Sequence, residues 1–254
     1  MAAIDPVLVA AVPLFAGMPP KEREALLQEA QSVRYPKGTT VFQQDADAHS
    51  FFVLLHGRLR VFKLTQDGQQ VVVRFVAPGE VFGVASAIGR TTYPGTAVAV
   101  VDSIALQWPS GSWARLVAAH PSLATNTLQT VGGRIQELHT RVVEMSTEQV
   151  ERRVAHTLLR LAQQAGKKVE TGVRIDFPIS RQDIAEMTGT TLHTVSRIIS
   201  AWEDRGLVES GRQKITVREP HQLLLIADDA VHQERAADRH AVALGDEAGL
   251  ARRV

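Results

Sequence analysis

The sequence predicts an α+β fold in which an antiparallel β domain precedes a long helix and a small helical domain. Between Val33 and about residue 108, short runs of β-branched and aromatic residues are separated by turn residues, which is typical of strands. After Pro121 the apolar residues recur every three or four positions, which is typical of helices. The 254 residues suffice for about two domains at roughly 150 residues each.

The β domain is expected to follow a short amphipathic helix over residues 19–32. Its clearest strands are predicted over residues 39–42, 51–57, 59–64 and 71–76. Asp67 and Gly68 stand between the last two strands and predict a hairpin with a type I′ turn, because that turn needs positive φ angles. Since exposed strand edges are a liability, we expect the strands to pack as an antiparallel barrel or roll.

The helix predicted after Pro121 carries an apolar seam. Its members alternate in steps of three and four residues and are Leu128, Val131, Ile135, Leu138, Val142 and Met145. This spacing is the heptad pattern of a coiled coil, so the seam predicts a homodimer. The alternative, a helix that packs only on its own domain, stays open because few heptads are present.

The second domain is expected to begin at Ser146, where Ser146-Thr147-Glu148-Gln149 fits a capping box that starts a new helix. Further on, SRQDIAEMTGTTLHTVSRIISAW (180–202) has the features of a helix-turn-helix. Ser180 is the expected N-cap of the first helix, Ala185 is small at the helix crossing, and Gly189 allows the tight turn.

The second helix of this motif has two distinct faces. Its expected buried stripe consists of Val195, Ile198, Ile199 and Trp202. His193, Ser196 and Arg197 share the opposite face, where an exposed Arg can contact guanine O6 and N7. The segment LVESGRQKITVREP that follows predicts a two-strand wing, whose Arg212 and Lys214 are candidates for phosphate contacts; an ordinary turn remains the alternative.

Composition excludes several classes of protein. The net charge is only +1, so nucleic-acid binding must rest on a local basic element. The absence of cysteine excludes disulfides, thiolate zinc sites and cysteine-ligated iron–sulfur clusters. No apolar run reaches about 18 residues and the start lacks a basic signal region, so we expect a cytoplasmic protein without a membrane contact. A P-loop, G-x-S-x-G and H-E-x-x-H are all missing, so an enzyme is not expected.

Several segments together resemble the CRP/FNR superfamily of transcription regulators over about residues 12–225. They are PLFAGMPP, YPKGTTVF, HGRLRVFK, APGEVFG and the run from ISRQDIAEMTG to EDRGLVES. The resemblance implies a jelly-roll sensor domain like those that bind cyclic nucleotides (1–120), a dimerisation helix (121–145), a winged helix-turn-helix (146–225) and a C-terminal tail (226–254). It also implies that an effector rearranges the two recognition helices on a palindromic operator, with RNA polymerase as a further partner.

The resemblance also assigns DNA contacts. Base-reading positions fall on Ser196 and Arg197, with Thr194 beside them, and backbone-contacting positions on Ser180, Arg181 and Thr191. His193 stands where the family usually has Glu. Because neutral His differs from Glu in its donors and acceptors, the half-site is expected to differ from the usual one.

The sequence lacks the residues that hold cyclic AMP in this family. Family members that bind cyclic AMP hold it with a Glu and an Arg-Ser pair, but here Val84 and Pro94-Gly95 occupy those positions, so cyclic AMP in its usual mode is not expected. The expected pocket residues are Val84, Ser86, Tyr93, Thr96, Leu138 and His139. A sensory module that regulates a partner protein without touching DNA is the alternative function.

Two stretches, TTYPGT (91–96) and GTTLHTVSR, resemble the nitric-oxide-responsive denitrification branch, and this resemblance implies haem as the cofactor. The effector would then be a gas rather than a small organic molecule. His49, His56 and His139 are the candidate iron ligands, and an ordinary hydrogen-bonded histidine is the alternative for each.

Overall fold

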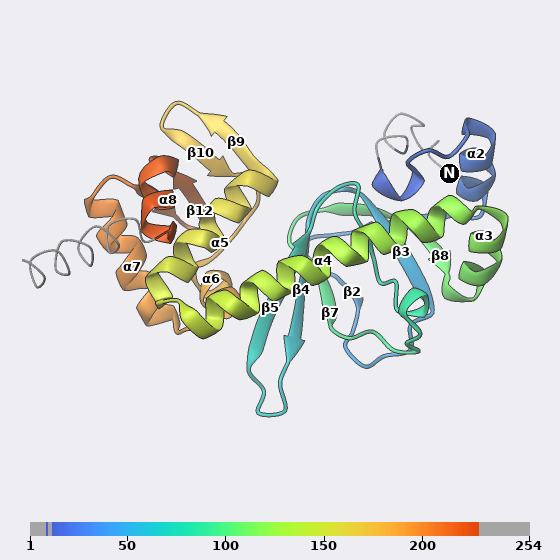
Figure 1. The fold of residues 1–254 in the computed structure, drawn as a ribbon, viewed down its shortest axis with the longest axis horizontal. Helices are drawn as coiled ribbons and strands as arrows, with labels where there is room; N and C mark the ends of the chain where they lie inside the picture. The colour runs from blue at the N-terminus through green and yellow to red at the C-terminus, as the bar shows by residue number, and fades with distance from the viewer. Residues whose placement is uncertain (1–8, 10–11, 229–254) are drawn as a thin grey trace, which may run out of the picture. The chain divides into compact units, whose positions relative to one another are not determined.

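The computed structural model describes residue 9 and residues 12–228. The chain divides into two compact units, Met1–Val143 and Glu144–Val254, and each is considered by itself (Figure 1). Within the described part of the chain, no helix is both long and apolar enough to span a bilayer.

The first unit contains two four-stranded sheets whose paired strands are all antiparallel. One sheet has the order β1(Gln31–Tyr35), β8(Ser103–Pro109), β3(Ser50–His56), β6(Val81–Phe82). The other has the order β2(Thr40–Phe42), β7(Thr96–Ala99), β4(Leu59–Leu64), β5(Gln70–Val76). Because the chain passes repeatedly from one sheet to the other, the arrangement is the expected antiparallel jelly roll, here called the β-roll.

Aromatic side chains fill part of the β-roll core. The rings of Phe42 and Tyr93 stack with their centroids 4.0 Å apart, and those of Phe52 and Phe82 stack at 4.9 Å. The hydroxyl of Tyr93 donates to the backbone oxygen of Ser50 at 2.7 Å, so the polar end of this buried ring is satisfied.

A second apolar cluster fixes the N-terminal helices to the β-roll. The 3₁₀ turn η1(Pro13–Phe15) and helix α2(Pro20–Gln28) pack against Trp108, whose indole N–H donates to the backbone oxygen of Leu26 at 2.9 Å. Two further 3₁₀ turns, η2(Ser86–Ile88) and η3(Ser110–Ser112), complete the unit.

The hairpin between β4 and β5 is confirmed, but the type I′ turn is wrong. Gly68 has a φ of 79°, whereas Asp67 is not among the residues with positive φ. The connection is wider than a two-residue turn: the backbone N–H of Gln69 donates to Thr65 Oγ1 at 3.0 Å, and the N–H of Thr65 donates to the oxygen of Gln69 at 2.9 Å. These hydrogen bonds satisfy the backbone groups of Thr65 and Gln69, which close a loop longer than the predicted two-residue turn.

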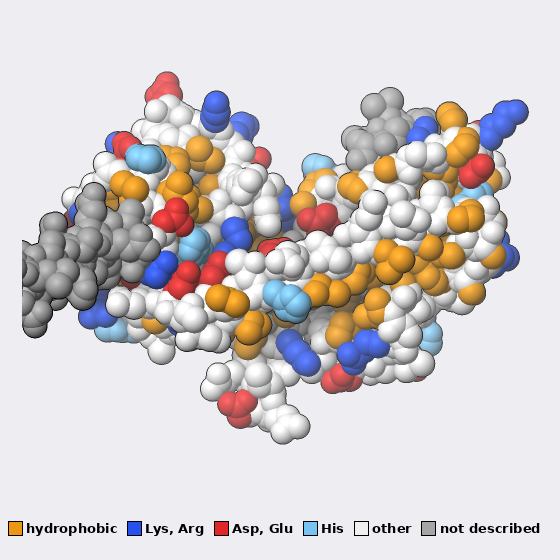
Figure 2. Space-filling model, in the orientation of Figure 1, with side chains coloured by type: hydrophobic (Ala, Val, Ile, Leu, Met, Phe, Trp, Pro, Cys, Tyr) orange, Lys and Arg blue, Asp and Glu red, His pale blue; other side chains and the backbone are white. Residues whose placement is uncertain are grey.

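Helix α3(Trp113–Ala119) leads into the long helix α4(Pro121–Thr147). The apolar seam of α4 is largely exposed, with Leu128 72%, Val142 61%, Met145 52%, Ile135 48% and Leu138 46% accessible. Figure 2 shows hydrophobic side chains gathered along this helix. A long apolar stripe in contact with solvent is what an unpaired coiled-coil helix presents.

The capping box predicted at Ser146 is wrong. Ser146 and Thr147 belong to the last turn of α4, and the N–H of Glu148 still donates to the oxygen of Glu144 at 2.9 Å. The next helix, α5(Val150–Ala165), begins after Gln149, which makes no side-chain cap bond. Because α4 keeps its helical hydrogen bonds through this segment, Ser146 is not free to cap a new helix.

The second unit joins helices to one small antiparallel sheet. Its elements are α5, β9(Gly166–Val169), β10(Gly172–Ile175), α6(Arg181–Thr188), α7(Leu192–Asp204), β11(Val208–Gly211), β12(Lys214–Val217) and α8(Pro220–Asp228). The sheet order is β11-β12-β10-β9, and the β9–β10 hairpin was not anticipated from the sequence. Helix α8 extends to Asp228, beyond residue 226 where the tail was expected to begin, and residues 229–254 lie outside the described residues.

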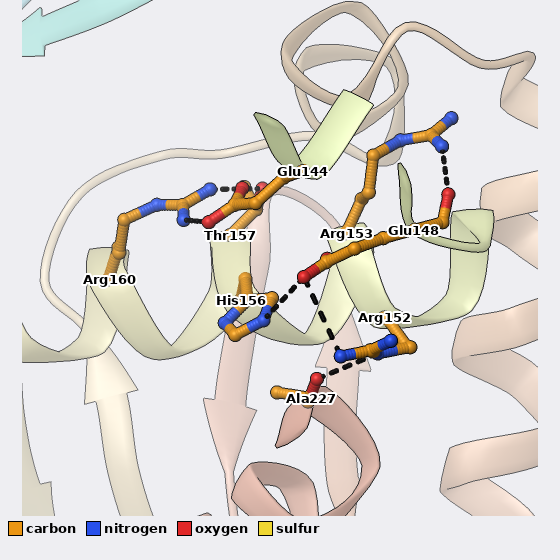
Figure 3. A network of polar contacts seen from close by, with 8 residues as sticks. All are labelled: Glu144, Glu148, Arg152, Arg153, His156, Thr157, Arg160 and Ala227. Carbon is orange, nitrogen blue, oxygen red and sulfur yellow. Dashed lines mark hydrogen bonds and ion pairs between the residues drawn. The ribbon is translucent and has the colours of Figure 1, made fainter. Parts of the chain in front are cut away.

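A polar network in the second unit joins the end of α4 to α5 (Figure 3). Arg160 on α5 donates to the carboxylate of Glu144 on α4 at 2.5 Å. The carboxylate of Glu148 lies 3.6 Å from the guanidinium of Arg152 and 3.4 Å from the Nε2 atom of His156. Arg152 also donates to the backbone oxygen of Ala227 in α8 at 2.9 Å, so this network ties three helices together.

Candidate functional site

The helix-turn-helix is built from α6 and α7. Ser180 caps α6 as predicted: its hydroxyl accepts from the N–H of Asp183 at 3.1 Å, while the Asp183 carboxylate accepts from the N–H of Ser180 at 2.8 Å. Gly189 ends the helix with a φ of 63°, a left-handed conformation that favours glycine. The tight turn expected between the helices is thereby confirmed.

Helix α7 has the two faces that the sequence predicts. Val195, Ile199 and Trp202 are fully buried, while Ile198 is only half-buried. The hydroxyl of Thr191 caps the helix by accepting from the N–H of Thr194 at 3.2 Å, and the two hydroxyl groups are 2.9 Å apart. Capping therefore occupies both threonine side chains, which were expected beside the DNA.

The outward face of α7 carries His193 and Arg197, which are exposed, and Ser196, which is half-buried. Among the described residues, the side chains of His193 and Arg197 have no hydrogen-bond or ion-pair partner. A guanidinium that is free of internal partners on an exposed helix face is available to a base edge in the major groove.

Arg181 lies differently from these residues. Its guanidinium donates to the Glu203 carboxylate at 2.9 Å and to the hydroxyl of Ser210 at 2.7 Å. It therefore braces the start of α6 against α7 and β11, and its expected contact with the DNA backbone stays a prediction.

Glu203 is the acceptor at the centre of this brace. Burial raises the pKa of its carboxyl, but the hydrogen bonds from Ser210 and the charge of Arg181 outweigh burial and lower the pKa below 4.5. The contacts of Glu203 with Arg181 and Ser210 thus hold a charged carboxylate near the C-terminal end of α7.

The predicted wing is present as the β11–β12 hairpin. Arg212 and Gln213 form its turn, with a φ of 59° at Gln213. Arg212 and Lys214 are both exposed. They are accessible to a phosphate backbone, and their contact with DNA stays a prediction.

A cavity of about 310 Å³ lies in the first unit between the β-roll and α4. Val84 and Leu138 line it, as expected. Its wall is formed by Phe42, Val61, Val73, Arg74, Phe82, Gly83, Val84, Ala85, Ile88, Pro94, Gly95, Val131, Arg134, Ile135, Glu137, Leu138 and Arg141.

The other four residues expected in this pocket are not among the lining residues. Tyr93 is buried in the aromatic core, and the hydroxyl of Thr96 accepts from the N–H of Gln44 at 3.0 Å. His139 is exposed on α4, and Ser86 is half-buried in η2, where Ile88 lines the cavity and Ser86 does not. Sequence position alone placed these residues near the cavity without showing which way each side chain points.

The wall lacks the groups that the family uses for cyclic AMP. Pro94 and Gly95 lie on it where the resemblance implies an Arg-Ser pair, and Val84 is where it implies a Glu. A Cβ at Gly95 would lie 2.8 Å from the backbone oxygen of Phe62, so a larger residue would force a shift in the backbone. A nucleotide phosphate would find no arginine at this position.

Charged side chains line the cavity instead near α4 and β5. Arg134 donates to the backbone oxygen of Val81 and lies 3.8 Å from the Glu80 carboxylate, which also pairs with Arg74. Burial and the nearby charge of Arg74 lower the pKa of Arg134 to about 10. The guanidinium is thus charged at neutral pH but poorly solvated.

Sequence reasoning missed these charged residues. Arg134, Glu137 and Arg141 follow one another at steps of three and four on α4, beside the apolar seam. This second stripe was the available signal, because its spacing places all three on one side of the helix.

The cavity wall does not fit a haem. Protein ligands to haem iron are His, Cys, Met or Tyr, and none of the described lining residues belongs to these types. His49, His56 and His139 are all exposed. In the described part of the chain, no three His, Cys, Asp or Glu residues come together as a metal site.

Comparison with known protein families finds one matching family model in each of the two units. The family model described as "Cyclic nucleotide-binding domain" matches residues 32–120, and the model described as "Crp-like helix-turn-helix domain" matches residues 152–226. The structure is similar to that of FixK2 from Bradyrhizobium japonicum, with a TM-score of 0.69 and 24% identity over 78% of this chain and 96% of that one. At this identity the likeness supports the fold.

Two curated relatives are similar over most of their length. The chain is 30% identical over 215 residues to the cyclic AMP receptor protein of Thermus thermophilus, covering 85% of this chain and 96% of the relative. It is 26% identical to the nitrogen fixation regulation protein FixK of Bradyrhizobium diazoefficiens, covering 77% of this chain and 81% of the relative. These relatives are transcription regulators rather than enzymes. The helix-turn-helix argues against the alternative function, a sensory module that regulates a partner protein without binding DNA. The chain belongs to the CRP/FNR family of DNA-binding transcription regulators, with an effector-binding domain before its helix-turn-helix.

Proposed function

We propose that the chain acts as a homodimer that binds a palindromic DNA site through α7 of each protomer, with its affinity set by an effector in the β-roll cavity. The observation that carries the proposal is the outward face of α7, where Arg197 is exposed and has no partner among the described residues. RNA polymerase is the further partner that a regulator of this family implies.

The seam of α4 supports the homodimer. Its apolar side chains are about half-exposed or more at five of the six positions, and a second copy of the helix would remove them from water. Each buried methylene group contributes about 0.8 kcal/mol, so the seam offers a substantial driving force for pairing.

The same helix connects the dimer to the cavity. Val131, Ile135 and Leu138 belong to the seam and also line the cavity. A ligand there would touch the helix that forms the dimer, and it would shift the regulator between arrangements if it binds one of them more tightly. This shared wall is the route by which we propose that occupancy of the cavity changes DNA binding.

The effector in this proposal is neither cyclic AMP in its usual mode nor haem. The first would lack its Glu and Arg-Ser partners, and the second would lack an iron ligand among the described lining residues. The resemblance to the nitric-oxide-responsive branch rests on TTYPGT and GTTLHTVSR alone.

Selection of binding sites from a random-sequence DNA library tests the proposal. We expect the full-length protein to enrich a palindrome whose half-sites are about 10 base pairs apart, one helical turn, because two symmetric recognition helices fit successive major grooves. The matched control is Arg197→Ala, which should enrich a less specific site. Enrichment of a site without two-fold symmetry, or of none, would contradict the proposed mode of binding.

A further inference from the structure

The charged side chains around the β-roll cavity carry an excess of positive charge. Arg74, Arg134 and Arg141 line the wall, together with Glu137, and Glu80 lies beside them. Three positive groups therefore face two negative groups. Counted over these described residues, the formal charge around the cavity is +1 before any ligand enters.

Glu80 cannot neutralise both of the arginines beside it. Glu80 is shared between Arg74 and Arg134. Arg134 also donates to the oxygen of Val81, and Arg141 donates to the oxygen of Val73, but these backbone carbonyls carry no net charge. Because one carboxylate, Glu80, lies beside two guanidinium groups, positive charge remains beside Arg134 even with the attraction of Glu137, and this charge attracts an anion.

Arg134 has unused hydrogen-bond donors. Both of its contacts with described residues run through Nη2, whereas a guanidinium has five N–H donors on three nitrogens. Its lowered pKa shows that burial already disfavours the positive charge. An anion beside Arg134 would compensate for the water that this group has lost.

The remainder of the wall is apolar. Phe82, Val84, Ile88, Ile135 and Leu138 are among its side chains. A binding site with mostly apolar walls and a few polar groups orients a ligand by the polar groups and gains affinity from the hydrocarbon that it buries.

We propose that this cavity binds a small organic acid, with its apolar body against the wall and its carboxylate paired with Arg134. The inference rests on the proposed function, from which it takes the cavity as the effector site, and it narrows the effector to one chemical class. The acid would then contact Val131, Ile135 and Leu138. Because these residues also belong to the seam of α4, binding of the acid would act on the helix that forms the dimer.

Calorimetry on the full-length protein with three probes of equal chain length tests the class. We expect octanoate to bind at one site per chain, at least tenfold more tightly than octan-1-ol, and octylammonium to show no measurable binding. Lengthening the acid from hexanoate to octanoate should tighten binding about fourfold per methylene, as burial of hydrocarbon requires. Equal binding of the acid and the alcohol, or binding of none of the three, would overturn the proposal.

Variants of Arg134 test the position of the carboxylate. Arg134→Gln should weaken octanoate at least tenfold and leave octan-1-ol unchanged, while Arg134→Lys should restore most of the loss because it keeps the charge. Arg90→Gln is the matched control, since Arg90 is exposed, belongs to the same unit and does not line the cavity. Unchanged thermal unfolding shows that the variants fold, and wild-type affinity for octanoate in Arg134→Gln would refute the assignment.

The two proposals fail in different ways, because the binding assay contains no DNA. If octanoate binds as expected but leaves the affinity for the selected palindrome unchanged, the ligand class stands and regulation through the cavity is wrong. If octanoate shows no preference over octan-1-ol while DNA binding is specific, the ligand class is wrong and the DNA-reading role stands.

Discussion

Arg160 and Glu144 form an ion pair between α5 and the end of α4, with Nη1 and Oε1 2.5 Å apart and the Glu144 side chain only 8% exposed. Removing the arginine would leave a nearly buried carboxylate with one partner fewer. We predict that Arg160→Met lowers the free energy of unfolding by about 1–3 kcal/mol, the cost of a buried polar group that loses its bond. Urea unfolding measures this loss.

The control for this prediction is Lys168→Met, which removes the same charge from an exposed position on β9 of the same unit. It should change the free energy of unfolding by less than about 0.5 kcal/mol. Equal effects of the two variants would show that the Arg160–Glu144 pair contributes nothing beyond net charge.

The brace at Glu203 predicts an acid-sensitive contribution to stability. Its pKa in the folded protein lies below 4.5, so the folded state binds fewer protons than the unfolded state in this range. The stabilisation is present above pH 4.5 and is lost as the pH falls through the lower folded-state value. Thermal unfolding at a series of pH values should show a shallower acid dependence for Glu203→Gln than for the wild type.

Glu209→Gln is the matched control for this experiment, because Glu209 is exposed on the neighbouring strand β11. The control should keep the wild-type acid dependence. If Glu203→Gln loses stability in parallel with the wild type as the pH falls, the carboxylate of Glu203 is not the group responsible.

The exposed seam of α4 predicts the site of dimerisation. Replacing Leu138 and Val142 with Glu would bring four carboxylates together in a paired seam, so we expect the double variant to be monomeric by light scattering. Gln136→Glu with Thr140→Glu adds the same charge at exposed positions off the seam and should stay dimeric. A dimeric seam variant would mean that another surface joins the protomers.

The cavity predicts that cyclic AMP does not bind in the usual way. Val84 and Pro94 offer neither a carboxylate for a ribose nor a positive charge for a phosphate. Calorimetry with cyclic AMP should therefore show no binding in the micromolar range. A micromolar affinity for cyclic AMP would contradict this prediction.

Local patterns predicted most of the fold. The clearest strands alternated with turn residues, and the seam of α4 and the stripe of α7 followed the helical period, so these elements could be found from their own residues, whereas β9 and β10 could not. The helix-turn-helix was also legible because Ser180 and Gly189 have roles that depend on nearby backbone groups. These features need no knowledge of the tertiary structure.

The errors arose where long-range contacts decide the outcome. Ser146 has the sequence of a cap, yet α4 continues through it. Tyr93 and Thr96 lie close to the cavity in sequence, but packing in the core and a bond from Gln44 turn them to other partners. The bond from Arg181 to Glu203 also depends on how α6 meets α7, so the sequence did not reveal it, and the contact of Arg181 with DNA stays a prediction.

Arg197 is proposed to read bases, and the binding of two variants to two DNA molecules tests this role most directly. The variants are Arg197→Ala on α7 and Lys214→Ala on the wing, measured on the selected palindrome and on random duplex at several salt concentrations. Lys214 is a better phosphate-contact control than Arg181, because loss of Arg181 would also break its bonds to Glu203 and Ser210.

We predict that Arg197→Ala costs about 1–3 kcal/mol of binding free energy on the palindrome and much less on random duplex. Lys214→Ala should weaken both about equally and reduce the salt dependence by about one counterion per lost contact. Equal losses on the two DNA molecules for Arg197→Ala would show that this face of α7 does not read bases.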